Sequence, residues 1–545
     1  AATWLCLALC TQAVRAESPD GALLYAEHCA SCHHAERIGM VGPPLVPLAL
    51  SRSSDDQLKT VIRQGLPSTQ MGGFPHFTPG ELEALVAFLR RPAQVEWSSE
   101  DIRNSFQPAG ASSPPPPAPS RLENLTAVVE RGSSLIWMME GQRVLDRFAF
   151  GNVHGGLKFS PDGAHVYVPS RDGWVGRYDV GQGYRGRIRA SIFLRNLAVS
   201  RDGRYVLVAS WMPSGIQVLD AGTLEPVKTL PVEGKISAIY ELDGRDEAVF
   251  TLRDRPVLGV LSTRTLEIAY RSLDEPLEDF FLDPLERFAV GTARQGTRLR
   301  AIDLTGLKTV FEHPVEGLPH LASAAFWYDR GQFYAATTHI QAPTLSVWRL
   351  YDWALIGQIP IGGNGFFVRT HPETPYLWID NGSQDLVLVE KRTLQVSKRG
   401  LGARVVHTEF SGDGGLAYVS LSGALVMLDA ATLVEAGRLQ ANSPVGKYNF
   451  VTKQRRYEPV LLGRQVYMER CWGCHHPTRE AFGPSLAAIF RRRPTSDIWA
   501  QILNPEGMHA RLGYRRNAMP RLELKPEEIE ALISYMKEQA RAAHQ

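Results

Sequence analysis

Two copies of a short motif, Cys-x-x-Cys-His, are the residues of this chain best suited to chemistry. They comprise Cys29, Cys32 and His33 near the start, and Cys471, Cys474 and His475 near the end. The spacing suits covalent haem attachment, in which two thiols add to the vinyl groups while the adjacent imidazole binds the iron. The sequence therefore predicts two covalent heme c groups.

Two other uses of paired cysteines fit less well. A zinc site needs four ligands close together, yet the two pairs lie at opposite ends of the chain. A thioredoxin-like redox pair needs a βαβ context, and neither flank offers one. The remaining cysteines, Cys6 and Cys10, fall in a leader-like stretch and are expected to have no role in the mature chain.

The first residues resemble a secretory leader. Residues 1–10 are almost wholly apolar, and Val14-Arg15-Ala16 offers small residues where signal peptidase cuts. We therefore predict a signal peptide over residues 1–16, truncated at its start, and a periplasmic location. The apolar run is shorter than the ~20 residues of a membrane-spanning helix, so we expect no membrane span. A membrane anchor is the alternative.

Composition divides the rest of the chain into three modules. Residues 97–120 include a Pro-rich stretch that cannot form a core, and we expect a stiff, extended linker there. It separates a small module, residues 17–96, from a region of short β-branched runs, residues 121–450. Residues 451–545 are again typical of helices.

The central region repeats a unit of strand, polar turn and strand. Its turns recur about every 40 residues, the length of one four-stranded propeller blade. They fall near Met139, Asp179, Asp220, Ser262, Asp303, Asp352, Glu390 and Asp429. These marks predict an eight-bladed β-propeller. An array of β-sandwiches would match the strand lengths but not the even period.

The charge balance excludes one class of partner. Lys plus Arg number 59 and Asp plus Glu number 57, which leaves a net charge of +2. A chain so nearly neutral gives no support to binding of a polyanion, and we expect no nucleic-acid partner.

Each outer module resembles class I cytochrome c, an all-α fold. A helix containing an aromatic residue precedes each motif, a Gly-Pro turn follows it, and an amphipathic helix ends the module. In that family a Met before the last helix is the sixth iron ligand, and Met71 and Met519 stand at that position. Met519-Pro520 matches the usual dipeptide, whereas Met71-Gly72 departs from it. The competing ligands are Met40, Met508, His34 and His476.

A cytochrome c module followed by an eight-bladed propeller resembles the cytochrome cd1 family. The segments that carry this resemblance are His154 with 157–163, 170–174, 195–198, 318–321, 365–371 and 446–449. The resemblance covers nearly the whole chain, and the C-terminal cytochrome c is an addition to the usual layout. It implies a non-covalent heme d1, or its dihydro precursor as substrate, across the propeller's central channel with His154 as iron ligand.

That family also suggests how the macrocycle is held. The carboxylates of heme d1 require cations, and the candidates are Arg171, Arg195 and Arg369. Gly155-Gly156 beside the iron ligand is expected to let a flat macrocycle approach the backbone. His371 and His407 lie near the matched segments and are further candidates for contact with it.

The residues opposite the iron ligand distinguish the activities of the family. Its nitrite reductases place two histidines over the iron; His320 matches the first, but Gly362–Gly365 stands where the second belongs. Loss of a positioned proton donor favours the dihydro-heme d1 dehydrogenase branch, which oxidises a propionate to an acrylate. There His320 would act as base or orient the substrate, and the covalent haems would accept electrons one at a time.

The resemblance further implies partners and alternatives. Periplasmic electron-transfer proteins would take the electrons, and a cytochrome cd1 nitrite reductase would be the recipient of finished heme d1. Reduction of nitrite to nitric oxide, and a non-catalytic role in electron transfer or heme d1 binding, are the two alternatives.

Overall fold

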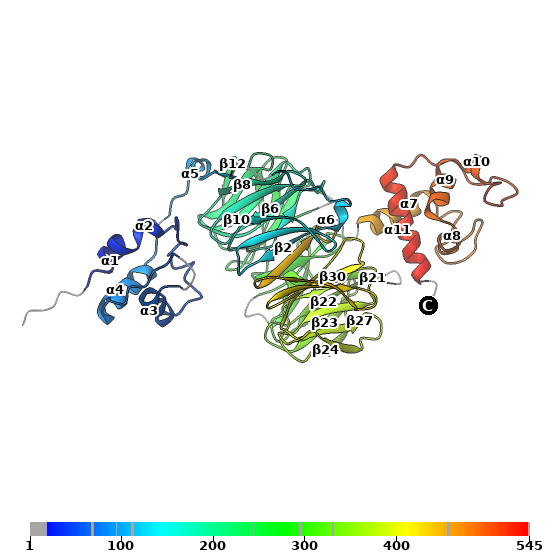
Figure 1. Ribbon diagram of the computed structural model, residues 1–545. Helices are drawn as coiled ribbons and strands as arrows, with labels where there is room; N and C mark the ends of the chain where they lie inside the picture. The colour runs from blue at the N-terminus through cyan, green and yellow to red at the C-terminus, as the bar shows by residue number, and fades with distance from the viewer. Residues whose placement is uncertain are drawn as a thin grey trace, which may run out of the picture.

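The chain folds into a helical module, a β-propeller and a second helical module, in that order (Figure 1). The computed structural model describes residues 19–66, 70–93, 95–110, 114–242, 245–293, 297–329, 332–454 and 458–542. The predicted signal peptide, residues 1–16, lies outside these ranges. No helix within them has the length and apolar character needed to cross a membrane.

Eight separate sheets confirm the predicted eight-bladed propeller. Blade 1 contains β5 (Lys158–Phe159), β6 (His165–Pro169), β7 (Trp174–Asp179) and β8 (Gly183–Arg189). Blade 2 contains β9 (Phe193–Val199), β10 (Tyr205–Met212), β11 (Ser214–Asp220) and β12 (Pro226–Pro231). Blade 3 contains β13 (Ile236–Glu241), β14 (Glu247–Leu252), β15 (Val257–Ser262) and β16 (Glu267–Ser272). Blade 4 contains β17 (Asp279–Leu282), β18 (Phe288–Thr292), β19 (Arg298–Asp303) and β20 (Thr309–Pro314).

The remaining blades follow the same antiparallel order. Blade 5 contains β21 (Ala325–Asp329), β22 (Gln332–Thr338), β23 (Thr344–Arg349) and β24 (Ala354–Pro360), preceded by η2 (Leu321–Ser323). Blade 6 contains β25 (Val368–Arg369), β26 (Tyr376–Asp380), β27 (Asp385–Glu390) and β28 (Val396–Gly400). Blade 7 contains β29 (Val405–Phe410), β30 (Leu416–Leu421), β31 (Ala424–Asp429) and β32 (Glu435–Gln440). Blade 8 joins β33 (Pro444–Asn449) to β2 (Leu125–Glu130), β3 (Leu135–Glu140) and β4 (Arg143–Ala149).

Blade 8 closes the ring, because it combines the last strand of the propeller with the first three. Thr126 pairs with Asn449 and Ala127 with Tyr448 in antiparallel register. η1 (Leu122–Asn124) and α6 (Phe450–Gln454) lie just outside this seam. Pairing the two ends of the propeller completes the eighth blade and fixes the last strand to the first.

The recurring turn has a local cause. In three blades an aspartate at the end of the third strand accepts a backbone N–H from a threonine two or three residues on: Asp220 from Thr223, Asp303 from Thr305 and Asp429 from Thr432. A leucine with positive φ follows in each, at Leu224, Leu307 and Leu433. The carboxylate thus holds a tight turn whose period the sequence displays.

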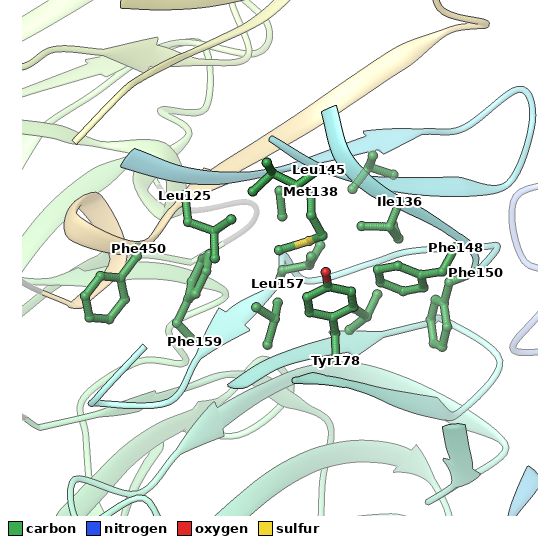
Figure 2. Packing of buried hydrophobic residues seen from close by; sticks show 14 residues of the cluster. Leu125, Ile136, Met138, Leu145, Phe148, Phe150, Leu157, Phe159, Tyr178 and Phe450 are labelled. Atoms are coloured by element: carbon green, nitrogen blue, oxygen red, sulfur yellow. The ribbon is translucent and has the colours of Figure 1, made fainter. Parts of the chain in front are cut away.

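The apolar core lies between neighbouring blades. Figure 2 shows Met138, Phe148 and Tyr178 meeting between blade 8 and blade 1, with Phe159 and Phe450 at one end of the same cluster. The rings of Phe148 and Tyr178 stack at 5.2 Å. Burial of such apolar faces between each pair of blades stabilises the ring.

The two helical modules share one design. The first contains α1 (Gly21–His28), α2 (Ala30–His33), α3 (Asp55–Gln64) and α4 (Pro79–Arg90), and the second contains α7 (Glu458–Arg470), α8 (Leu486–Arg492), α9 (Thr495–Leu503), α10 (Pro505–Met508) and α11 (Pro526–Ala542). In each, the first and last helices cross at a glycine. A Cβ on Gly21 would lie 2.1 Å from the Ala84 carbonyl oxygen, and one on Gly463 would lie 1.9 Å from that of Ala531.

The predicted linker over residues 97–120 is wrong in its first half. α5 (Ser99–Asn104) buries Ile102 completely in the core between blades 1 and 2. β1 (Gln107–Pro108) then pairs with the outer strand of blade 1, Gln107 opposite Arg187. The composition did not indicate these two elements, because a six-residue helix and a two-residue strand form only against the surface of the propeller.

The loops of the propeller fall on two faces, because neighbouring strands run in opposite directions. We name as the near face the side on which the innermost strand of each blade begins; it carries His154 and His320. The far face is the opposite side, which carries the turns at 160–163 and 411–414.

The two helical modules contact opposite faces. On the near face, the Arg189 guanidinium donates to the carbonyl oxygens of Ile38 and Gly39 in the first module. On the far face, Glu373 forms an ion pair at 2.6 Å with Lys537 of α11. The propeller therefore separates the two Cys-x-x-Cys-His motifs, in agreement with their places at either end of Figure 1.

Candidate functional site

The histidine of each Cys-x-x-Cys-His motif is oriented by a backbone carbonyl. His33 Nδ1 lies 2.8 Å from the Pro43 oxygen and His475 Nδ1 lies 2.7 Å from the Pro484 oxygen. A ring nitrogen that donates in this way leaves Nε2 with its lone pair, which is the usual arrangement of a metal-binding imidazole. Both rings are thus set as iron ligands.

The Gly-Pro turn holds each imidazole from the other side. A Cβ on Gly42 would lie 2.5 Å from His33 Cε1, and one on Gly483 would lie 2.5 Å from His475 Cε1. Only glycine allows so close an approach. The donor set and this matched geometry fit covalent haem in both modules.

The thiols of the motifs argue against a redox role of their own. Cys29 and Cys471 are buried, and burial raises the pKa of each to about 11. A reactive cysteine pair requires the opposite shift, toward thiolate. Cys32 and Cys474 are exposed, and none of these four cysteines forms a disulfide.

The predicted sixth ligands stay predictions. Met71 is half-buried, and its carbonyl oxygen accepts from the Leu66 N–H at 3.0 Å. Met519 is also half-buried, in the core of the second module, with its sulfur 3.8 Å from Gln501 Nε2. The competitor Met40 is 59% exposed.

His154 lies on the near face, in the loop that leads into blade 1. Its Nδ1 is 2.8 Å from the Arg195 carbonyl oxygen, and its Nε2 is 3.5 Å from the Arg195 guanidinium. Burial first, then the cations of Arg171 and Arg195, lower the pKa of His154 to about 3. The ring is therefore neutral and its Nε2 lone pair is available, as an iron ligand requires.

His320 is held in the same way on the other side of the channel. Its Nδ1 lies 2.5 Å from the Phe366 oxygen and 3.0 Å from Ser323 Oγ. The blades follow one another around the ring in chain order, so blade 5, which carries His320, stands four places from blade 1 in a ring of eight. Two imidazoles thus approach the channel from opposite sides.

Positive charge is concentrated around His154. The pKa of Arg171 is lowered to about 10 by burial and by repulsion from Arg52, Arg195 and Arg131. Arg52 belongs to the first helical module, and the other three belong to the near face. Like charges gathered in this way destabilise one another, and an anionic ligand would relieve that repulsion.

Arg369 occupies the opposite part of the channel. Its guanidinium donates to the Ser323 carbonyl oxygen at 3.2 Å and lies 3.3 Å from His407 Nε2. Since Ser323 also contacts His320, the structure brings Arg369, His407 and His320 together. Arg171 and Arg195 stay with His154.

Sequence reasoning missed the role of Lys447. This side chain is fully buried, and its Nζ donates to the His407 carbonyl oxygen and to Ser420 Oγ. Burial lowers its pKa well below the usual value, and it raises the pKa of neighbouring Tyr448. The signal that could have found it is its place in the Gly-Lys-Tyr-Asn segment, one of those that carry the family resemblance.

Gly155 and Gly156 lie in close contact with the neighbouring blades. Both have positive φ, and a Cβ on Gly155 would lie 2.7 Å from Asn196 Cβ. A Cβ on Gly156 would lie 2.9 Å from Tyr448 Cε1. Contact with neighbouring blades therefore requires glycine at both positions, and the expected approach of a macrocycle stays a prediction.

His371 is remote from the near face. Its Nε2 donates to the Gly412 oxygen at 3.2 Å on the far face, and its Nδ1 accepts from the Glu373 N–H at 3.1 Å. Both nitrogens are used in holding loops, so His371 has a structural role.

His371 also makes the propeller sensitive to acid. Burial lowers its pKa to about 4, so below pH 6.5 the unfolded chain binds a proton that the folded chain refuses. This contribution is complete above pH 6.5 and is lost as the pH falls toward 4, by roughly 3 kcal/mol. We expect His371→Gln to flatten the pH dependence of the free energy of unfolding by that amount. Denaturant titrations of both proteins from pH 4 to 8 measure the difference; parallel curves would contradict it.

Arg189 fixes the first module to the near face. It is buried, donates to the Asp172 oxygen at 3.1 Å and to the Gly39 oxygen at 2.9 Å, and lies over the Trp97 ring at 5.4 Å. One guanidinium thus joins the loop after the first haem motif to the loop that follows Arg171.

Arg189→Met should loosen this contact. The substitution keeps the bulk but leaves buried carbonyl oxygens without donors, at about 1–3 kcal/mol each. We expect faster hydrogen exchange in residues 38–42 and in the 170–173 turn, with exchange in blades 4–6 unchanged. Arg187→Met, at a half-buried neighbour over Trp174, is the matched control. Equal exchange in the two variants would show that Arg189 does not hold the module.

The comparisons with known proteins agree with this geometry. Residues 120–453 match the family described as cytochrome D1 heme domain. The chain belongs to the cytochrome d1 heme domain family. Residues 16–89 match cytochrome c oxidase, cbb3-type, subunit III, and residues 460–540 match cytochrome c. A cytochrome d1 heme domain between two c-type modules is thus confirmed.

Two relatives and one solved structure are similar to this chain over more than half of its length. It is 37% identical over 471 residues to "Dihydro-heme d1 dehydrogenase" of Pseudomonas aeruginosa, covering 80% of this chain and 94% of the relative. It is 26% identical over 373 residues to "Protein NirF" of the same organism, covering 62% of this chain and 93% of that protein. The solved structure "Dihydro-heme d1 dehydrogenase NirN in complex with DHE" matches with TM-score 0.75 and 36% identity, covering 80% of this chain and 99% of that one. The chain is therefore a homologue of that dehydrogenase and an oxidoreductase.

Proposed function

We propose that this cytochrome d1 family member oxidises dihydro-heme d1, turning one propionate side chain into an acrylate. The observation that carries the proposal is the near face, where His154 and His320 stand on opposite sides of the ring and arginines gather around His154. A flat, carboxylate-bearing tetrapyrrole meets both requirements, because it has an axial direction for imidazole and negative charge for guanidinium. The 37% identical relative has the corresponding name.

The residues divide the work of binding. His154 Nε2 would hold the iron of the substrate, with Nδ1 fixed on the Arg195 carbonyl. Arg171 and Arg195 would bind carboxylates on one side and Arg369 on the other, each acting as a donor to an anion. The charge repulsion among the arginines falls when those carboxylates enter, which favours binding of the anionic substrate.

The oxidation must release two electrons and two protons. Two C–H bonds of the propionate break and one C=C bond forms. His320, whose Nδ1 donates to Phe366, would accept one proton at Nε2 and pass it to solvent, and the second proton would leave directly to water. Covalent haem in the first module, when bound, supplies a one-electron acceptor beside the near face. Arg189 keeps the first module against the near face. Arg52 of that module adds its charge to the arginine cluster around His154.

The absence of a second distal imidazole disfavours nitrite reduction. Gly363 packs against the Asn381 carbonyl oxygen, where a Cβ would lie 2.4 Å away, and Gly365 packs against that of Asp380. This loop is therefore set by blade 6 and presents no proton donor in the place where nitrite reductases of the family have one.

The test is anaerobic incubation of the haem-loaded protein with dihydro-heme d1. We expect the released pigment, extracted with acidified acetone, to have the acrylate spectrum, and two c-type haems to be reduced per acrylate formed. Unchanged pigment would contradict the proposal. Nitrite turnover at about ten per second, an ordinary enzymatic rate, would establish the reductase alternative instead.

The cellular location and the partners of the protein are part of the same proposal. The leader-like residues and the covalent haem motifs support a periplasmic enzyme with two heme c groups. A cytochrome cd1 nitrite reductase is then the expected recipient of the product. Expression in a denitrifying host, followed by fractionation and a pyridine haemochrome count of covalent haem, tests both statements.

A further inference from the structure

The two c-type modules present opposite sides to the propeller. The first module turns its motif side inward, since the carbonyls of Ile38 and Gly39, between His33 and the Gly-Pro turn, accept from Arg189. The second module contacts the far face with its first and last helices. A cavity of about 720 Å³ between them is lined by Val460 of α7 and by Ser534 of α11. Its motif side is therefore turned away from the propeller.

That outward side carries exposed aromatic residues. Phe482, which directly precedes the glycine against His475, is 78% exposed, and Trp472 within the motif itself is 62% exposed. Tyr514 is 40% exposed and lies 5.7 Å from the Arg493 guanidinium. In Figure 1 α8, α9 and α10 also lie on the side of the module away from the propeller. Exposed aromatic side chains at the motif itself, such as Trp472 and Phe482, favour an interaction site there.

The same part of the module is strongly basic. Residues 476–522 contain eight arginines against three acidic residues. Seven of the arginines are exposed: Arg479, Arg491, Arg492, Arg511, Arg515, Arg516 and Arg521. Among the residues that the structure describes, none of these seven has a carboxylate within ion-pair distance. Their charge is left for something outside the chain, whereas the chain as a whole has a net charge of only +2.

We propose that this basic face, defined by Trp472, Phe482, Tyr514 and the seven arginines, docks a small acidic one-electron redox protein. Aromatic side chains at the centre would exclude water, and the surrounding arginines would steer an acidic partner and fix its orientation. The partner takes one electron per encounter from ferrous haem in the second module, so two encounters balance each two-electron oxidation. The direction of electron flow rests on the proposed function, but the docking surface does not.

The test compares two probes and three variants, of which two reverse charge and one, Phe482→Ser, removes an aromatic ring. The probes are an acidic blue-copper protein and a lysine-rich cytochrome c, each titrated against the haem-loaded full chain at low and high salt. Arg491→Glu/Arg492→Glu/Arg515→Glu reverses charge on the basic face. Arg143→Glu/Arg201→Glu/Arg271→Glu makes the same change at exposed arginines of the propeller. Haem absorbance and far-UV circular dichroism confirm that each variant is folded.

We expect the acidic probe to bind the wild type and the propeller variant alike. The basic-face variant should bind it at least tenfold more weakly, with a smaller dependence on salt. Phe482→Ser should weaken binding without changing the salt dependence. Oxidation of dihydro-heme d1 with ferricyanide as acceptor should be unchanged in all three variants, which separates a failure of docking from a failure of the proposed function. Equal binding of the two probes, or an unaffected basic-face variant, would overturn the proposal.

Discussion

His154→Ala is expected to lower the affinity for dihydro-heme d1 on the order of 100-fold or more, while both covalent haems stay attached. Its Nδ1 is fixed on the Arg195 carbonyl at 2.8 Å, which leaves Nε2, 3.5 Å from the Arg195 guanidinium, as the nitrogen that would bind iron. The neutral ring needs no deprotonation, because its pKa is about 3. Alanine removes the ligand and leaves the arginine cluster in place, so a residual, charge-driven affinity should persist and fall with added salt.

The measurement is a spectroscopic titration of the haem-loaded protein with the free pigment, in wild type, His154→Ala, His320→Ala and His371→Gln. His371→Gln controls for loss of a buried histidine, since that residue lies on the far face. We expect His320→Ala to bind the pigment but to oxidise it at least 100-fold more slowly. The reverse pattern, with binding lost in His320→Ala and retained in His154→Ala, would exchange the two roles.

The blade pattern could be predicted because its cause is local. Each aspartate turn contains its own hydrogen-bond acceptor and its own leucine with positive φ, so the period appears in the sequence without knowledge of the ring. The haem motifs were equally visible, since all their reacting atoms lie within five residues. The eight sheets confirm the propeller, and the family matches confirm a c-type module around each motif, while covalent attachment at the four cysteines stays a prediction.

Contacts between distant segments could not be predicted. In the sequence, nothing distinguishes Arg189 from the other arginines of an outer strand. Only in the folded chain does it contact Ile38, 151 positions away. The placement of the two haem modules on opposite faces depends on the closed ring, in which β33 pairs with β2. Lys447 lies within one of the segments that carry the family resemblance, but its burial beside His407 depends on the same closure of the ring.

The opposed placement of the modules predicts that their haems are not interchangeable. Cys29→Ser/Cys32→Ser removes the haem attachment beside the near face, where Arg52 already repels Arg171. Cys471→Ser/Cys474→Ser removes the attachment beyond the far face. If electrons leave the substrate through the near module, the first variant should lose oxidation with any acceptor. The second variant should lose it only when the acceptor must dock on the basic face.

Turnover of dihydro-heme d1 with two acceptors measures this difference. With ferricyanide, the near-module variant should fall at least about 100-fold, a rise of roughly 3 kcal/mol in the barrier, and the far-module variant should keep the wild-type rate. With an acidic blue-copper protein as acceptor, both variants should fail. Titration of the pigment serves as the control, because the channel's own histidines and arginines are intact in both. Equal losses with ferricyanide would mean that the two haems act together, and the propeller would then not divide the route of substrate oxidation from the route of electron exit.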